Sequence, residues 1–364
     1  MRSIIIKIIT AITATLICIT LVSCNSQEQN SFAANETSSD ALSGTSETEW
    51  DTSELLKTES ETSSIEEEKN ANKIVLSGKP DDTFVADTDC YAESDEIVMF
   101  FQRDVKIRGD MLEIAENAMN NLRETTGFNF NKNYSGDYDT DIMDLYFEPG
   151  IFADINSDSS KINILVINLG DGVEWAGDDY VALTSTDFDF TDNNYGVLYH
   201  ELSHVLQFRN GVSLGGVMDE GFATYTENKA RLSHGIPAWN AIQFYFSVDF
   251  DEGLISESDK DFSYQFENYD DNYQYGFRFV TFLYETYGEN IYSDILSEAT
   301  KNGFDPACDT DNPEASKEAN SKQLLEIIKS LTTEDVLSDF SQWCNSNWDA
   351  LGQKYMEQLN SMEQ

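Results

Sequence analysis

The chain has 364 residues, and its 67 acidic side chains far outnumber its 22 Lys and Arg side chains, which gives a formal net charge of −45. Such a surface excludes nucleic acid as a partner, because nucleic-acid binding needs a basic footprint. The same charge favours solubility and suits cationic rather than anionic substrates.

The first residues predict an export signal. Arg2 and Lys7 accompany an apolar run over about residues 4–21, which ends in Leu-Val-Ser-Cys with Cys24 as its last residue. This ending resembles the lipobox of bacterial lipoproteins, which implies a signal peptide over 1–23 and lipidation of Cys24. The alternative is an ordinary cleaved signal peptide in which Cys24 is incidental. Since no later segment has the length and apolarity of a membrane span, we expect an extracytoplasmic protein held to the cell membrane by lipid.

Residues 24–75 are rich in Ser, Thr and Glu and contain few apolar residues, so they predict a flexible linker behind the lipidated cysteine. Residues 76–364 are enough for one large domain or two apposed lobes with a substantial core. Once Cys18 and Cys24 are set aside, Cys90, Cys308 and Cys344 remain. Three cysteines allow at most one disulfide, which argues against a disulfide framework and against a cysteine-based metal site.

The first part of this body has the pattern of strands with one helix. Strands are expected within 73–105, mainly at 74–76 and 97–101, and a helix is expected over 108–126, closed by Gly127. Further strands are expected at 142–147, 162–168 and 180–184. A small mixed sheet crossed by a helix is the predicted outcome.

The second part is helical throughout. The apolar spacing predicts helices over 194–210, 219–235, 275–287, 322–331 and 334–348. Gly211 and Gly288 are expected to end the first and third of them, and Asp219 to cap the second. The predicted fold class is therefore α+β, with a sheet-bearing lobe over about 76–211 and a helical lobe over about 212–364.

His200-Glu201-Leu202-Ser203-His204 is the strongest feature of the chain. Residues four apart on a helix project from one face, so both imidazoles can bind one metal ion. Glu201 flanks the histidines and is placed to act as a general base on a water at the metal. The apolar stripe of the same helix lies on the opposite side, at Leu198, Leu202 and Val205.

A hydrolytic zinc site needs a third protein ligand and leaves its fourth position to water. The continuation His-x-x-Gly-x-x-His is excluded, because Gln207 and Asn210 occupy those positions. The next carboxylates are Asp219 and Glu220, at the start of a predicted helix and followed by Gly221, which permits close backbone approach. Glu220 is the candidate ligand, and Asp219 is the alternative.

Together, His-Glu-Leu-Ser-His-Val-Leu-Gln and the later Asp-Glu-Gly-Phe-Ala-Thr-Tyr resemble the gluzincin metallopeptidases, including membrane aminopeptidases and bacterial collagenases. The resemblance extends loosely over 162–348 and implies a zincin-like catalytic domain. It also implies that His200, His204 and Glu220 hold one Zn²⁺, and that Glu201 is the general base. The implied cleft lies between the two lobes, with 180–184 as an edge strand that pairs with an extended protein or peptide substrate.

The chain departs from the aminopeptidases in one respect: their amine-binding Gly-x-Met-Glu-Asn element is missing before His200. We therefore expect an endopeptidase. A donor to the developing oxyanion is also needed, and Tyr275 is the first candidate and His234 the second. A packing role for Tyr275 and a helix-terminal role for His234 stay open. Thr224 either hydrogen-bonds a zinc ligand or packs in the core.

One further motif resembles the beginning of a calcium loop, from Asp154 to Asp158, but Leu165 stands where the final Glu is needed. We therefore expect a turn there and no calcium. Taken together, the sequence predicts a cell-surface zinc endopeptidase on a lipid anchor. The alternative is a catalytically inactive binding or adhesive lipoprotein with the same fold, and the sequence leaves the oligomeric state open.

Overall fold

The computed structural model describes residues 72–130, 140–152, 155, 160–168, 175–177, 180–184, 196–234, 269–306 and 312–362. All of them belong to one compact unit, Glu68–Gln364. The predicted signal peptide, Cys24 and nearly all of the predicted linker lie outside the described residues. Within the described part of the chain, no helix has the length and apolarity needed to span a membrane.

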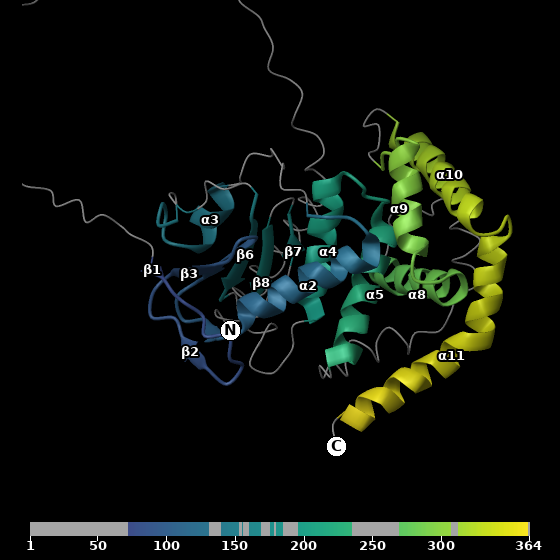
Figure 1. The fold of residues 1–364 in the computed structure, drawn as a ribbon. Helices are drawn as coiled ribbons and strands as arrows, with labels where there is room; N and C mark the ends of the chain where they lie inside the picture. The colour runs from purple at the N-terminus through teal and green to yellow at the C-terminus, as the bar shows by residue number, and fades with distance from the viewer. Residues whose placement is uncertain are drawn as a thin grey trace, which may run out of the picture. The chain divides into compact units, whose positions relative to one another are not determined.

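A six-stranded mixed sheet forms the N-terminal half (Figure 1). Strands β4, β6 and β8 are parallel to one another, while β3 and β7 run antiparallel to their neighbours β4 and β8. A separate two-stranded sheet pairs β2 with β5. In spatial order the large sheet contains β1 (Asn72–Lys73), β3 (Cys90–Glu93), β4 (Ile97–Phe101), β6 (Ile162–Ile167), β8 (Tyr180–Thr184) and β7 (Trp175–Ala176), and the small one contains β2 (Thr83–Val85) and β5 (Lys106–Arg108).

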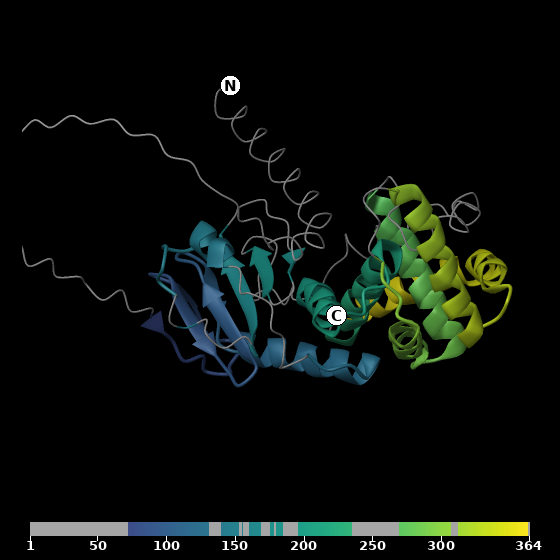
Figure 2. The same cartoon turned by 90° about the horizontal axis from the view of Figure 1, so that it is seen from above.

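Each face of the large sheet has its own core, because successive side chains of a strand point to opposite faces. On β4, Met99 belongs to the main core, which includes α2 (Met111–Thr126), and Phe100 belongs to a smaller core with α3 (Thr140–Tyr146). Figure 2 shows the two helices on opposite sides of the sheet. Gly127 closes α2 as predicted, with φ of 73° and its N–H donating to the carbonyl of Arg123.

The prediction of a strand over 142–147 is wrong, because this segment forms α3. Met143 and Phe147 are buried, whereas Leu145 between them is 69% exposed. A half-buried strand would have placed all three side chains on one face, so the apolar spacing of four selects a helix instead.

The expectation that 180–184 is an edge strand is also wrong. β7 pairs with β8 through Trp175 opposite Ala182 and Ala176 opposite Val181, so β7 is the outermost strand on this side. Both strands contact α4 (Gly196–Asn210), the helix that carries the histidine motif. The sheet edge nearest that motif is therefore β7.

The C-terminal half is helical, and the predicted α+β fold class is confirmed. Gly211 and Gly288 follow helix ends with positive φ of 60° and 96°, as the sequence indicated. One helix, α9, was not predicted, and α10 and α11 are longer than expected. After α4, the helices are α5 (Gly216–His234), α8 (Tyr269–Tyr287), α9 (Ile291–Lys301), α10 (Pro313–Leu331) and α11 (Val336–Met362).

Helix α5 packs closely against both α4 and α8. Its approach to α8 depends on two glycines, since a Cβ atom on Gly221 would lie 2.4 Å from the carbonyl carbon of Gly276, and one on Gly276 would lie 2.2 Å from the carbonyl oxygen of Val217. No side chain fits at either position, so the predicted role of Gly221 in close backbone approach is confirmed.

Candidate metal centre

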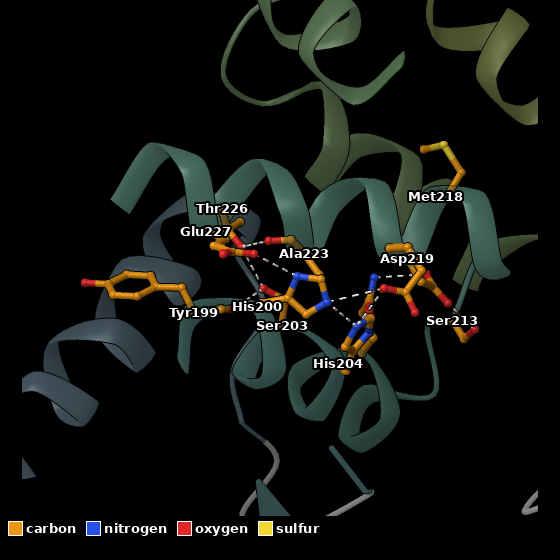
Figure 3. A network of polar contacts seen from close by, with 12 residues as sticks. Tyr199, His200, Ser203, His204, Ser213, Met218, Asp219, Ala223, Thr226 and Glu227 are labelled. Atoms are coloured by element: carbon orange, nitrogen blue, oxygen red, sulfur yellow. Dashed lines mark hydrogen bonds and ion pairs between the residues drawn. The ribbon is translucent and has the colours of Figure 1, made fainter. Parts of the chain in front are cut away.

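Helix α4 places His200 and His204 on its inner side, 5% and 8% exposed, with their Nε2 atoms 3.3 Å apart (Figure 3). The opposite stripe, with Leu202 as an example, is fully buried in the main core, as predicted. Between the histidines, the Ser203 hydroxyl donates to the carbonyl of Tyr199 and lies 3.0 Å from the Thr226 hydroxyl on α5. Core packing and this contact fix the rotation of α4 about its axis.

Glu220, in the first turns of α5, completes a triangle with the two imidazoles. Its Oε2 atom lies 3.3 Å from Nε2 of His200 and 3.5 Å from Nε2 of His204. This oxygen is buried and has no hydrogen-bond donor among the described residues. The three predicted metal ligands are therefore brought together, and they form a group capable of holding a metal ion.

The spacing of this triangle fits zinc. A tetrahedral ion with bonds of about 2.0 to 2.1 Å holds its ligand atoms about 3.3 to 3.4 Å apart. The three distances in the structure are 3.3, 3.3 and 3.5 Å. Two imidazole nitrogens and one carboxylate oxygen are also the donor set that zinc takes in hydrolytic sites. These three groups are thus arranged as a ligand set.

Behind His200 lies a carboxylate that the sequence analysis missed. Oε2 of Glu227 is 3.3 Å from Nδ1 of His200, and Arg231 donates to Oε1 of Glu227 at 2.6 and 2.9 Å. The Arg231 side chain in turn covers Gly196 at the start of α4, where a Cβ atom would lie 2.6 Å from Nε. The 3.3 Å contact lacks hydrogen-bond geometry in this structure. A carboxylate beside Nδ1 favours a proton on that nitrogen, which would leave the Nε2 lone pair to a metal ion.

The charged groups of the metal centre strongly shift the pKa values of its residues. Burial alone would lower the pKa of His200, but its contacts with Glu220 and Glu227 and the charge of Glu201 hold that pKa well above its ordinary value. The pKa of His204 is raised in the same sense, with the charge of Glu220 as the main cause opposing burial. Burial opposes ionisation of Glu220 as well, yet the two histidines hold its pKa far below the usual range. Without a metal, protons therefore take the place of the cation.

Asp219 is not the third ligand, because its carboxylate is occupied elsewhere. It accepts hydrogen bonds from the Ser213 hydroxyl at 2.5 Å, from the Leu214 N–H at 2.9 Å and from Gln207 Nε2 at 2.9 Å. Burial raises its pKa to about 6 in spite of these donors. Asp219 thus ties the loop before α5 to the end of α4, which fixes the position of the next residue, Glu220. The helix itself begins at Gly216 rather than at the predicted cap.

Tyr275 is not placed to donate to an oxyanion. It is 2% exposed and packs in the core against the rings of Phe279 and Phe340. Two positions earlier on α8, the half-buried Tyr273 stacks on His200, with ring centroids 5.7 Å apart and planes within 16°. Residues two apart lie on nearly opposite sides of a helix, so the side of α8 that meets the metal centre is the side of Tyr273.

The remaining sequence predictions have mixed outcomes. Thr224 is fully buried, and its hydroxyl has no hydrogen-bond partner among the described residues. Cys90 and Cys344 are free and buried. The side chain of His234, most of the 154–158 segment, and Cys308 lie outside what the structure describes.

No protein-family model matches the chain, and no curated protein matches it. Among solved structures, a functionally unknown conserved protein from Bacillus anthracis aligns with a TM-score of 0.38 and 11% identity, and a mutant of a functionally unknown conserved protein from the same organism with a TM-score of 0.40 and 10% identity. Each alignment covers 75% of this chain and 52% of the other, so the chain spans about half the length of these neighbours. Likeness at this level carries no argument about function.

Proposed function

We propose that this protein is a zinc-dependent endopeptidase whose metal is held by His200, His204 and Glu220. The observation that carries the proposal is the triangle of their three ligand atoms, with sides of 3.3, 3.3 and 3.5 Å. Zinc bound there would supply Lewis acidity toward a peptide carbonyl and toward water. The gluzincin-like motifs and the fit of the donor set point to the same metal.

Glu201 is the general base of the proposed reaction. It is buried on α4 directly after His200, and its negative charge acts to raise the pKa of both histidines. It is not one of the three clustered ligands. A carboxylate beside the metal that does not bind it can accept a proton from the attacking water and return it to the leaving amine.

An extended substrate would bind along β7. The outer edge of β7 has no partner strand within the described ranges, and this strand touches α4. Backbone hydrogen bonds to an edge strand hold a peptide extended whatever its side chains are. The missing amine-binding element of the aminopeptidases leaves internal bonds of a polypeptide as the preferred target.

The proposed location is the outer side of the cell membrane. It rests on the export signal over 1–23 and on the lipobox-like ending at Cys24. Metabolic labelling with a fatty acid should mark the wild-type chain and leave Cys24→Ala unlabelled. Labelling that survives the substitution would contradict lipidation at this residue.

Glu201→Gln tests the enzymatic proposal. The variant should bind zinc as the wild type does and should lose essentially all hydrolysis of an unfolded casein-like substrate, because only the base has changed. Zinc content and peptide release are measured on the same samples. Undiminished turnover would refute the assigned base. A wild-type protein that binds zinc but cleaves nothing would instead favour the inactive binding lipoprotein.

A further inference from the structure

Phe208, one turn after His204 on α4, is an aromatic side chain left open at the metal centre. Its ring stacks on His204, with centroids 6.3 Å apart and planes within 24°, and the side chain is 39% exposed. The other large apolar side chains exposed within the described residues all belong to the sheet-bearing half: Val75, Phe84, Val85 and Leu145. Phe208 is the one that touches a metal ligand.

The backbone that carries Phe208 is held firmly. The next residue, Arg209, is buried and donates from Nη2 to the carbonyl of Lys161 at 2.8 Å and from Nη1 to that of Ser160 at 3.3 Å. Asn210 donates to the carbonyl of Asn129 at 2.7 Å. The last turn of α4 is thus tied to two other parts of the chain, which holds the backbone of Phe208 in place beside the metal centre.

We infer that Phe208 is the floor of an apolar subsite beside the metal centre, a conclusion that rests on the proposed peptidase function. A large aliphatic or aromatic side chain of the substrate, close to the bond held at the metal, packs on the open face of the ring. Because the ring already stacks on His204, covering its open face loses less conformational entropy than ordering a free side chain would. One well-placed apolar contact of this kind changes affinity by about tenfold or more.

The subsite gives a function to an apolar ring that is exposed beside a metal ligand. It also makes the proposed endopeptidase selective, since two polar residues flanking a peptide bond would leave Phe208 uncovered. Tyr273 on His200 is the corresponding ring on the other imidazole, but it is half-buried. The more exposed of the two rings is the one assigned to selectivity.

The test uses the full chain loaded with zinc. Cleavage of a mixed peptide library by the wild type should show large apolar residues enriched at one position next to the cleaved bond. Two peptides that differ only by Leu or Ser at that position are then compared. The wild type should prefer the Leu peptide by about tenfold in kcat/KM, and Phe208→Ala should reduce that ratio to near one. Phe208→Leu should keep most of the preference.

Phe84→Ala is the matched control, because Phe84 on β2 is 40% exposed but lies in the small sheet. It should keep the wild-type ratio, and zinc content should be the same in every variant compared. An unchanged Leu-to-Ser ratio in Phe208→Ala with full zinc would overturn the inference, as would a wild-type profile without apolar enrichment.

Binding without cleavage separates this inference from the proposed function. In a Glu201→Gln background, the Kd of a fluorescent apolar peptide and of its Leu-to-Ser analogue should differ by about tenfold, and Phe208→Ala should abolish the difference. Binding that ignores Phe208 contradicts the subsite even if the wild type is a peptidase. Absence of cleavage by the wild type contradicts the peptidase proposal, while the Kd comparison still decides the role of Phe208.

Discussion

Glu227→Gln is expected to weaken zinc binding although it removes no ligand. The neighbouring Arg231 and His200 lower the pKa of Glu227 from 4.5 to about 2 against the effect of burial. A net shift of that size corresponds to about 3 kcal/mol in favour of the ionised carboxylate, which is what the attraction of Arg231 and His200 leaves after the cost of burial. The variant removes the negative charge that faces both Arg231 and Nδ1 of His200. Loss of such a partner typically weakens metal affinity by about 10-fold to 100-fold.

Zinc affinity is measured by competition with a chromogenic chelator, and stability by urea unfolding of the metal-free protein. Because the pKa of Glu227 is depressed in the folded state, its contribution to the free energy of unfolding is fully present above pH 4.5 and disappears as the pH falls toward about 2. The stability difference between wild type and variant should shrink over that window.

The double variant Glu227→Gln with Arg231→Met is the control. Removing the Arg231 charge as well should recover part of the stability, since the positive charge that Glu227 balanced is then gone too. Zinc affinity should stay low, because the negative charge beside Nδ1 is still missing. If Glu227→Gln binds zinc as tightly as the wild type, the assigned role of this carboxylate is wrong.

Three further predictions concern the same centre. Because the pKa of His200 is raised, its contribution to the stability of the metal-free fold is full below pH 6.5 and is lost as the pH rises through the raised pKa. The difference in unfolding free energy between the wild type and His200→Gln should therefore become smaller at alkaline pH. Addition of zinc at neutral pH should release protons, which a pH-stat measures. Gly276→Ala should force α8 away from α5, lowering the unfolding free energy by about 1–3 kcal/mol and weakening zinc binding, and a wild-type Tm would contradict the Gly221 contact. Tyr275→Phe should change turnover by less than about twofold, whereas removal of an oxyanion donor would lower it about 100-fold.

The part of the site that lies within one helix could be predicted from the sequence. The spacing of His200 and His204 and the apolar stripe opposite them fix one face of α4, because helix geometry alone determines which side chains share a face. Helix geometry alone could not predict Glu220 as a ligand, since its position depends on how α5 packs against α4. The motif around it and the neighbouring Gly221 carried that information.

The two residues that the sequence analysis missed, Glu227 and Tyr273, reach the metal centre through contacts between helices. Glu227 is seven residues after Glu220, two turns along the same side of α5, and its spacing of four to Arg231 was the available signal. Its contact with Nδ1 of His200 follows from the rotation of two packed helices, which spacing does not give. The rotation of a third helix, α8, likewise decides that Tyr273, and not Tyr275, meets His200.

The errors in the sheet have a similar cause. A short, mostly apolar segment such as 142–147, interrupted only by Asp144, fits a strand and a short amphipathic helix about equally well. The exposure of Leu145 in α3 settles the choice only in the folded chain. The two-residue strand β7 is too short to leave a periodic signal. Because β7 pairs with β8, β7 and not β8 is the edge strand among the described strands.

X-ray absorption at the zinc edge of the zinc-loaded full chain tests the metal centre most directly. One zinc per chain is expected, with two imidazole nitrogens and one carboxylate oxygen at about 2.0 to 2.1 Å, and Glu220→Gln should lose the carboxylate and much of the affinity. A wild-type protein that takes up no zinc, or a bound zinc whose shell lacks the two imidazoles, would contradict the assignment of His200, His204 and Glu220.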